Sequence, residues 1–343
     1  MPDAPTPGPV APPGSPVGWR PLVEADAPAW SATVIAAAEA DGLEQRYTPE
    51  DLLDELRSPG VDPALDSMAA FLPDCRIAAA GMVTARSPGP QMRRYDLEGT
   101  VHPEHRRSGL GHGLLAWQEA RARAIHARDA TMVPGRIGVG AEERQDDVVG
   151  LATRAGFAPA RYYTMLRRPI GATFPDVPPP PDGVRIEPFD HRYDEAVRAA
   201  HNDAWTDHWG YSPRTAEGWR AWVSGHRNFR ADWSRLALTG QDDIAGYVIN
   251  FGFDQDWPAQ GFTEGYTMLV GVRRPWRGRG VAANLLADSM SAYRDAGLEY
   301  AGLDVDSDNP TGALHLYLRL GYVPRRRTVL LDKEIPPAGG GRR

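Results

Sequence analysis

The sequence carries one arrangement of motifs twice. A short basic stretch containing glycine recurs at an offset of 171 in the numbering (277 minus 106), and a second motif ending in Gly-Phe or Gly-Tyr recurs at an offset of 165 (321 minus 156). The matched positions are Arg106 and Arg277, Gly109 and Gly280, Leu114-Leu115 and Leu285-Leu286, and Gly156-Phe157 and Gly321-Tyr322. A chain that repeats its motifs at a long, nearly constant interval is expected to fold as two related units.

The length of 343 residues is sufficient for two domains of ordinary size. Four consecutive prolines, residues 178–181, can continue neither a helix nor a central strand, so they indicate a stiff linker. Each half mixes strand-like and helix-like stretches, which predicts an α+β fold with a mixed, mostly antiparallel central sheet flanked by helices. The expected segments are a disordered proline-rich arm over 1–17, a first domain over 18–170, a linker over 171–183, a second domain over 184–335 and a flexible tail over 336–343.

The repeated stretch has the features of an anion site. In the second copy an apolar strand, 269–272, is followed by a turn with Gly278 and Gly280 and then by a predicted helix. Glycine lets the backbone turn tightly and approach a ligand, and a helix start presents unpaired N–H groups with a partial positive charge. Four arginines surround this turn: Arg273, Arg274, Arg277 and Arg279. We therefore expect the stretch to hold a phosphate group.

Two common phosphate-binding folds fit the sequence less well. A Walker-type loop requires Gly-Lys-[Ser/Thr], which neither copy contains. A dinucleotide-binding fold is imitated by Gly278-x-Gly280-x-x-Ala283 and by Asp304, which ends the next strand. That fold needs several more strand–helix units, but only 39 positions remain after Asp304 (343 minus 304), and the first copy has a different glycine spacing.

A third interpretation is a resemblance to GNAT-type N-acetyltransferases. Arg277-x-x-Gly280-x-Ala282 and Arg106-x-x-Gly109-x-Gly111 are similar to the [Arg/Gln]-x-x-Gly-x-[Gly/Ala] loop of that family. Residues 309–322 resemble its second signature, Asn-x-x-Ala-x-x-x-Tyr-x-x-x-Gly-[Phe/Tyr]. The resemblance covers about 18–170 and 182–335 and implies two tandem GNAT-like domains with acetyl-CoA, or another acyl-CoA, as the donor.

The resemblance implies a donor site in each copy. In the second copy the implied donor-binding residues are Leu269, Val270, Val272, Arg277, Gly278, Arg279, Gly280, Val281, Ala282, Ala283 and Asn309. In the first copy they are Arg106, Arg107, Ser108, Gly109, Leu110 and Gly111. Helix capping would explain Asn309 equally well. The end of the strand before the loop would also donate an N–H group to the thioester carbonyl, as an oxyanion hole does.

The resemblance also implies catalytic and substrate residues. Tyr317 matches the family's general acid, and Glu264, on the strand before the loop, is the nearest candidate for the general base. Asp254 and Asp256 are rivals that would attract a cationic substrate, and His208 and Trp209 lie where such folds build the acceptor pocket. Core packing or a solvated surface would also account for each of these residue types.

The two halves differ at the catalytic positions. The first half has Ala152 at the position of Tyr317, and the offset of 171 relates Glu264 to Arg93 (264 minus 93). We therefore expect catalysis in the second half, whereas the first half would bind acyl-CoA without turnover or only support the fold.

The activity that the resemblance implies is acetyl transfer to a primary amine of a small molecule by direct attack, without a metal. Alternatives are a non-catalytic acyl-CoA sensor or scaffold and an aminoacyl-tRNA-dependent transferase, and the net charge of −7 argues against nucleic acid as a partner. Cys75 is the only cysteine, so a cysteine metal cluster is excluded. No apolar run approaches the roughly 20 residues that span a bilayer, and the N-terminal arm lacks the apolar core of a secretory signal, so we expect a cytoplasmic protein. The sequence specifies neither the acceptor amine nor the oligomeric state.

Overall fold

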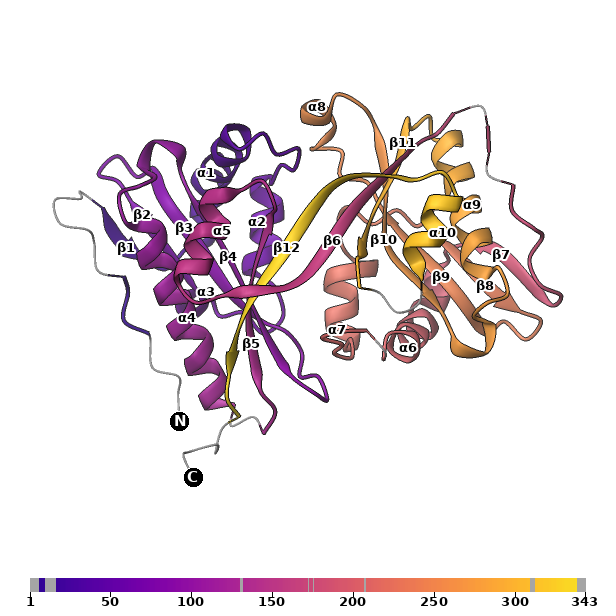
Figure 1. Ribbon diagram of the computed structural model, residues 1–343, viewed down its shortest axis with the longest axis horizontal. Helices are drawn as coiled ribbons and strands as arrows, with labels where there is room; N and C mark the ends of the chain where they lie inside the picture. The colour runs from indigo at the N-terminus through magenta and orange to yellow at the C-terminus, as the bar shows by residue number, and fades with distance from the viewer. Residues whose placement is uncertain are drawn as a thin grey trace. The chain divides into compact units, whose positions relative to one another are not determined.

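The computed structural model describes residues 6–9, 17–129, 132–171, 173–174, 176–206, 208–308 and 312–337. Contacts divide the chain into two compact units (Figure 1). Unit 1 consists of Met1–Arg161 and Val329–Arg343, and unit 2 consists of Tyr162–Thr328.

Unit 1 is a sheet with the strand order β1-β2-β3-β4-β5-β12. Its strands are β1 (Gly18–Arg20), β2 (Ser67–Phe71), β3 (Ile77–Ala85), β4 (Arg93–Val101), β5 (Gly135–Glu142) and the end of β12 (Val323–Ile335). Its helices are η1 (Glu24–Asp26), α1 (Ala27–Ala40), α2 (Pro49–Leu56), α3 (Pro63–Asp66), η2 (Pro103–His105), α4 (Leu110–Arg128) and α5 (Asp146–Arg154). Strands β1 to β4 are antiparallel neighbours, whereas β4 and β5 are parallel.

Unit 2 has the corresponding order β6-β11-β10-β9-β8-β7. Its strands are β6 (Ala158–Pro169), β7 (Val184–Pro188), β8 (Arg235–Thr239), β9 (Ile244–Phe251), β10 (Glu264–Val272) and β11 (Tyr300–Asp306). Its helices are η3 (His191–Tyr193), α6 (Asp194–Ala204), α7 (Ala216–Trp219), η4 (Arg220–Ser224), α8 (Trp257–Gln260), η5 (Arg274–Trp276), α9 (Val281–Asp295) and α10 (Ala313–Arg319). Both units have the expected α+β architecture, in which one pair of strands is parallel and the other described pairs are antiparallel.

The last strand of each sequence copy closes the other unit. Strand β6 follows the motifs of the first copy but pairs with β11, from Tyr163↔Asp306 to Pro169↔Tyr300. The end of β12 belongs to unit 1, where Lys333 Nζ lies 2.7 Å from the Glu119 carboxylate. Figure 1 shows the magenta β6 beside β11 and the yellow β12 beside β5.

Because of this exchange, the boundaries of the compact units differ from the boundaries of the sequence repeats. The expected boundaries at 170 and 184 follow the motifs, whereas contacts divide the chain after Arg161, so the proline-rich segment 171–183 lies inside unit 2. A strand belongs to the unit whose sheet edge it pairs with. The β5 edge of unit 1 and the β11 edge of unit 2 occupy corresponding places in the two sheets, so either could receive the last strand of either copy. The repeat in the sequence therefore does not reveal the exchange.

The parallel strands of unit 2 separate halfway along their length. Strands β10 and β11 pair from Glu264↔Tyr300 to Thr267↔Leu303, although β10 continues to Val272. A register shift against β9 makes Met268 an additional, bulged residue directly after the last of these pairs. We call the region beyond this last pair the fork. Backbone groups of β10 that face the fork have no partner on β11, so they remain available to an extended ligand.

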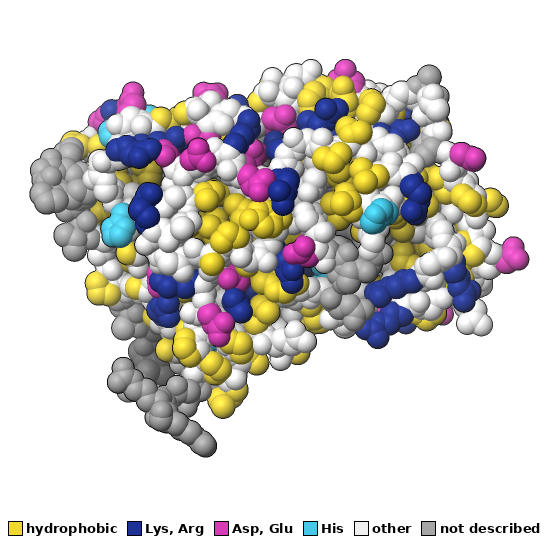
Figure 2. Space-filling model, viewed as in Figure 1, with side chains coloured by type: hydrophobic (Ala, Val, Ile, Leu, Met, Phe, Trp, Pro, Cys, Tyr) yellow, Lys and Arg dark blue, Asp and Glu magenta, His cyan; other side chains and the backbone are white. Residues whose placement is uncertain are grey.

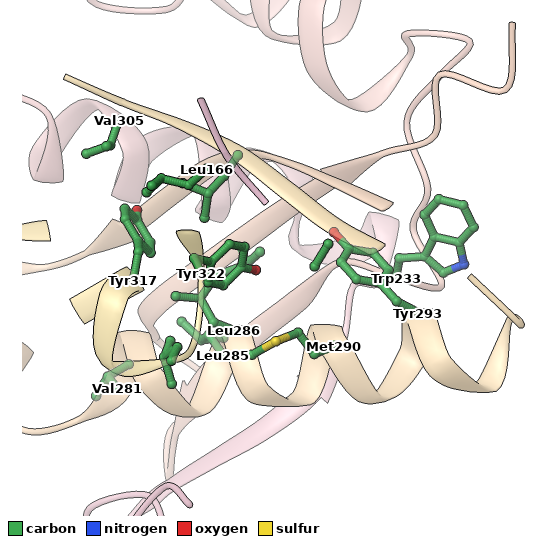
Figure 3. Packing of buried hydrophobic residues seen from close by; sticks show 14 of the residues in the cluster. Leu166, Trp233, Val281, Leu285, Leu286, Met290, Tyr293, Val305, Tyr317 and Tyr322 are labelled. Atoms are coloured by element: carbon green, nitrogen blue, oxygen red, sulfur yellow. The ribbon is translucent and has the colours of Figure 1, made fainter. Parts of the chain in front are cut away.

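The hydrophobic core of unit 2 fixes α9 against one face of the sheet. Residues Val281, Leu285, Leu286, Met290 and Tyr293 are buried along one side of this helix (Figure 3). Such spacing places side chains on one helical face. The contact is close enough that a Cβ on Gly265 would lie 2.3 Å from the Tyr293 ring. The first turn of α9 is thereby held at the fork.

The visible surface carries no single dominant charge. In Figure 2 acidic and basic side chains are interspersed over most of the face shown. Among the described residues, no helix combines the length and the apolar character needed to cross a membrane.

Candidate active site

The turn between β10 and α9 has the backbone of an anion cradle. Gly278 and Gly280 have φ angles of +73° and +81°, in the left-handed region that residues with a side chain rarely adopt. Gly280 is the N-cap of α9 and no side chain caps the helix. Asn284 is the first residue of the helix whose backbone N–H donates to a backbone carbonyl one turn earlier, at 3.1 Å from Gly280 O. The preceding N–H groups of the helix, including Val281, are therefore available to an anion.

The first arginine of this motif supports the fold directly. Arg277 donates from Nε to Val272 O at 3.1 Å and from a terminal nitrogen to Ala204 O at 2.7 Å. Arg273 binds the Asp203 carboxylate at 3.0 Å. These side chains join the cradle to the C-terminal end of α6, a role that the sequence analysis did not assign to them. Arg279 is exposed and lies over the Trp276 ring, so its charge remains accessible.

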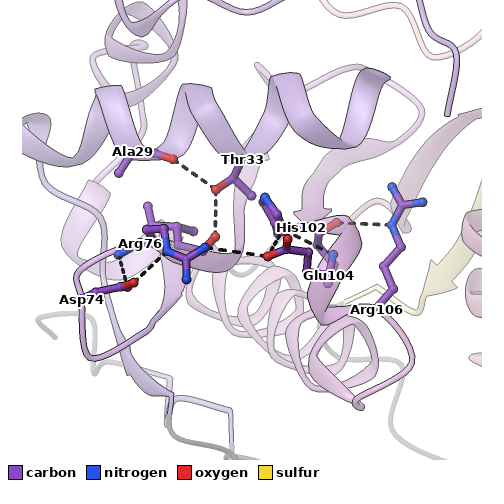
Figure 4. A network of polar contacts seen from close by, with 9 residues as sticks. Ala29, Thr33, Asp74, Arg76, His102, Glu104 and Arg106 are labelled. Carbon is purple, nitrogen blue, oxygen red and sulfur yellow. Dashed lines mark hydrogen bonds and ion pairs between the residues drawn. The ribbon is translucent and has the colours of Figure 1, made fainter. Parts of the chain in front are cut away.

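Unit 1 preserves the same cradle. Arg106 donates to Val101 O at 3.4 Å (Figure 4). It also binds Asp41, the C-cap of α1, at 2.6 Å. Gly109 has a φ of +89° and is again an N-cap without a side-chain cap. Arg107 adopts a φ of +64° at the position of Gly278, which costs a side-chain-bearing residue about 1 kcal/mol. The remaining donor-binding positions expected here begin α4 or directly precede it: Ser108, Leu110 and Gly111.

Side chains that could bind a metal also meet in unit 1. Atoms of His102, Glu104 and His105 lie within 4.8 Å of one another. The Arg76 guanidinium is 3.7 Å from Glu104, and it also binds Asp74 (Figure 4). This fixed positive charge opposes the binding of a cation at the same carboxylate.

Tyr317 lies on the side of the unit 2 sheet that α9 covers. It belongs to α10 and is 7% exposed, and it packs in one cluster with Val281 and Leu285. Its ring centroid is 6.0 Å from that of Tyr322 (Figure 3). Burial raises the pKa of the Tyr317 hydroxyl to about 12, so the group stays protonated and can act as a proton donor. Its counterpart Ala152 is buried in α5 of unit 1, and Asn309 lies outside the described residues.

Glu264 is held in a buried ion pair. Its Oε1 is 2.6 Å from Nε of Arg167 on β6, and a Cβ on Gly302 would lie only 2.5 Å from the same oxygen. The Arg167 guanidinium lies over the Phe262 ring, 4.4 Å from its centroid. Both oxygens of the Glu264 carboxylate are therefore already in contact with a cation.

The bulge at Met268 changes which residues of the two copies correspond. Gly265 and Tyr95 both face the helix that packs on their sheet, because a Cβ on Gly265 would meet Tyr293 of α9 and Tyr95 bonds to His126 of α4. These two residues are 170 positions apart (265 minus 95). Arg94, rather than Arg93, is therefore the counterpart of Glu264.

Asp304 and Tyr266 form a second acidic feature at the fork. Asp304 follows Leu303, the last residue of β11 that pairs with β10, and it is exposed. The Tyr266 hydroxyl donates to Asp304 Oδ2 at 2.5 Å. Burial raises the pKa of the Asp304 carboxyl, although the Tyr266 bond and the charge of Arg326 oppose that rise. Water reaches the Asp304 side chain, but the surrounding protein atoms reduce the hydration of its carboxyl group.

The sequence alone does not reveal this pair, for a physical reason. In the sequence, Asp304 stands out only because it resembles a ribose-binding acid at the end of a strand. Two neighbouring parallel strands bring residues 38 positions apart (304 minus 266) into contact. The sequence feature that could have indicated this pair is an acidic residue, Asp304, near the end of the strand that follows the cradle and its helix.

The expected acceptor residues of the α6 region form an aromatic stack. His208 lies against Trp205 with ring centroids 4.1 Å apart, and Trp205 Nε1 donates to the Tyr247 hydroxyl at 3.0 Å. His201 Nδ1 is 2.7 Å from the same hydroxyl, and burial lowers the pKa of His201 to about 3. Trp209 follows this stack and is half-buried. The stack packs against β9, on the side of the sheet opposite α9.

The two acidic rivals lie at the other end of β10. Asp254 is exposed and binds Arg230 at 3.1 Å, and Asp256 is a buried residue at the start of α8. Both precede Glu264, whereas the cradle follows Val272. The nine residues of β10 span about 30 Å at the rise of a strand. The structure thus separates these carboxylates from the cradle by the length of the strand.

Comparisons with known proteins agree with this geometry. The model of the Acetyltransferase (GNAT) family matches residues 194–322. A mycothiol acetyltransferase from Parafrankia sp. (strain EAN1pec) is 30% identical over 342 residues, covering 93% of this chain and 98% of that protein. A GCN5-related N-acetyltransferase from Sphaerobacter thermophilus has a TM-score of 0.71 at 27% identity, covering 96% of this chain and 98% of that chain.

A tandem GNAT protein from the clavulanic acid biosynthesis pathway has a TM-score of 0.65 at 18% identity, and the match covers 95% of this chain and 100% of that chain. The two units therefore define a tandem GNAT-fold protein. The chain belongs to the GNAT acetyltransferase family. It is an N-acetyltransferase whose donor is acetyl-CoA or another acyl-CoA, and its two-domain architecture is similar to that of mycothiol synthase. The uncapped, glycine-containing cradle and the unpaired edge of β10 fit such a donor.

Proposed function

We propose that unit 2 transfers an acetyl group from acetyl-CoA to a primary amine of a small molecule. The observation that supports this proposal is that Tyr317 and Val281, the first residue of the cradle helix, belong to the same buried core cluster. Acetyl-CoA supplies an activated acyl group as a thioester. The acceptor amine attacks it directly, without a covalent enzyme intermediate.

The cradle and the strand before it bind and orient the donor. The backbone N–H groups between Gly278 and Ala283, together with the side chain of Arg279, hold its phosphate groups, and Asn309 is a further candidate contact to the donor. The unpaired edge of β10 from Leu269 to Val272 pairs with its extended arm, and an N–H group of this edge stabilises negative charge on the acyl oxygen. Holding both reactants in register lowers the entropic part of the barrier.

Tyr317 donates the proton that the departing sulfur needs. Its hydroxyl is in a largely dry position and makes no hydrogen bond to the described residues, so it is free to interact with a ligand. Figure 3 shows the ring standing between Val281 of α9 and Val305 of β11. A positioned acid of this kind contributes about 10²–10⁴-fold to rate.

Unit 1 would not carry out the acetyl transfer proposed for unit 2. With Ala152 in place of the tyrosine, unit 1 lacks the proton donor but keeps the cradle. We infer that it binds acyl-CoA without turnover, and its strand β6 contributes Arg167 to the catalytic unit. The acceptor amine enters unit 2 beside the aromatic stack of His208 and Trp205, which Trp209 follows. Several of the relatives are named mycothiol acetyltransferases.

The test is release of free coenzyme thiol with a panel of amines, comparing wild type with Tyr317→Phe. We expect turnover to fall by about 10²-fold or more while acetyl-CoA affinity is retained. Tyr322→Phe is the matched control, because the Tyr322 hydroxyl is buried without a hydrogen-bond partner in the described structure. Near-normal turnover in Tyr317→Phe, or equal losses in both variants, would reject the assignment. Acetyl-CoA binding without turnover of any amine would instead support a sensor or scaffold.

A further inference from the structure

We infer that Asp304, oriented by Tyr266, is the carboxylate that accepts the proton of the attacking amine and selects a cationic small-molecule acceptor. This inference rests on the proposed function. It replaces Glu264 in the role of general base by a residue on the neighbouring strand.

The location of Asp304 fits this role. The last pair between β10 and β11 is Thr267↔Leu303, so Asp304 is the first residue of β11 at the fork. Leu303 and Val305 belong to the core that packs on α9, and by the period of two Asp304 faces the opposite side of the sheet. Tyr317 lies on the α9 side. A proton acceptor and a proton donor thus approach the fork from opposite faces.

The accessibility of the two carboxylates favours Asp304. It is exposed, whereas Glu264 is 5% exposed and both its oxygens contact Arg167. Removing a proton from an amine requires a carboxylate oxygen within hydrogen-bond reach of the nitrogen. Glu264 could offer one only after the ion pair with Arg167 opened. Asp304 Oδ2 accepts the bond from Tyr266, which leaves Oδ1 for a ligand.

The charged groups around Asp304 set its properties. Tyr266 on β10 donates to it, the positive charge of Arg326 on β12 acts on it, and Glu264 acts on Tyr266. Burial raises the pKa of Asp304, while Tyr266 and Arg326 counteract that rise. The pKa of Tyr266 lies well above its usual value because of burial and the nearby acid, so Tyr266 remains a hydrogen-bond donor. Asp304 is consequently a stronger base than an ordinary aspartate.

The reaction balances with these two residues. The ammonium form of the acceptor gives one proton to Asp304, and the nitrogen then forms a bond to the acyl carbon while the carbon–sulfur bond breaks. Tyr317 gives its proton to the sulfur, the nitrogen then loses its second proton, which restores the Tyr317 hydroxyl, and Asp304 gives its proton to solvent. An exposed carboxylate attracts a cationic amine by charge and repels an acceptor that carries a carboxylate or phosphate next to its amino group.

The experiment measures kcat and KM for the amine as a function of pH, together with acetyl-CoA affinity by calorimetry. We expect Asp304→Asn to lower kcat by about 10²-fold or more and to abolish the acidic limb of the pH profile. The calorimetric affinity for acetyl-CoA and the Tm should be unchanged. Tyr266→Phe should lower kcat less and move the acidic limb to higher pH, because it removes a bond that lowers the pKa of Asp304.

Asp295→Asn is the matched control, since this aspartate is exposed at the end of α9 and should retain the wild-type profile. A wild-type profile for Asp304→Asn overturns the inference. If Asp304→Asn has a lower Tm, the pH profile of Tyr266→Phe is the test instead. An acidic limb at the wild-type pH in Tyr266→Phe then overturns the inference. Loss of turnover in Tyr317→Phe alone would leave the proposed function intact and reject only the role of Asp304. Unchanged turnover in both variants would reject the proposed function as well.

Discussion

Nε of Arg167 lies 2.6 Å from Oε1 of Glu264, and these two residues belong to opposite halves of the sequence repeat. Arg167 is on β6, the last strand of the first copy, and Glu264 begins β10, the strand that leads to the cradle. The unit that carries Tyr317 is therefore completed by a buried side chain from the copy that has Ala152 at the corresponding position.

The position of β6 predicts which fragments of the chain fold. A fragment of residues 162–328 contains all six strands of unit 2 in one continuous segment, including most of β6. A fragment of residues 184–335, which follows the repeat, lacks β6 and leaves Glu264 buried without its partner. We expect cooperative thermal unfolding by circular dichroism for 162–328 and not for 184–335. The reverse order of stability would contradict the strand exchange.

Removing one partner of the buried pair should cost more stability than removing both. Arg167→Met removes the cation that contacts the buried Glu264 carboxylate, and breaking a buried ion pair in this way typically destabilises by about 3–5 kcal/mol. The double variant Arg167→Met/Glu264→Leu removes both charges and should recover most of the loss in urea unfolding. The exposed pair of Arg57 and Glu24 provides the control, because Arg57→Ala should change stability by under about 1 kcal/mol. A double variant no more stable than Arg167→Met would refute this account.

The arginines of the cradle should separate into two classes. Arg277→Ala removes the bonds to Val272 O and Ala204 O, so it should lower the Tm and weaken acetyl-CoA binding together. Arg279→Ala should leave the Tm unchanged and reduce the salt dependence of binding, because its exposed guanidinium acts only through charge. Calorimetry at two salt concentrations and thermal unfolding distinguish them. Equal effects of the two variants on Tm would show that Arg277 has no structural role.

His201 should make stability depend on pH. Burial lowers its pKa to about 3, whereas an unfolded histidine has a value of about 6.5, so the unfolded state binds more protons between these values. The free energy of unfolding should therefore fall as the pH drops below about 6.5, by up to about 1.4 kcal/mol per pH unit from this group. His201→Asn should show a shallower decline in urea unfolding. The same slope in wild type and variant would exclude this contribution.

The sequence predicts the parts of the site that depend on local backbone geometry. Gly278 and Gly280 adopt left-handed φ angles, and a helix begins at Val281, as glycine spacing and apolar periodicity indicate. The role of Arg277 and the contact between Tyr266 and Asp304 could not be predicted, because both join segments distant in sequence. The bulge at Met268 shifts strand faces by one residue without any marker in the composition.

The strand exchange also sets an order of events during synthesis. The segment 329–337, which closes the β5 edge of unit 1, is made only after the whole of unit 2. The earlier part of unit 1, Met1–Arg161, therefore keeps the β5 edge unpaired until the last strand is made, whereas unit 2 can complete its sheet before that. Exposed strand edges promote misassociation, so early termination near the C-terminus should damage the distant N-terminal unit rather than the one being translated.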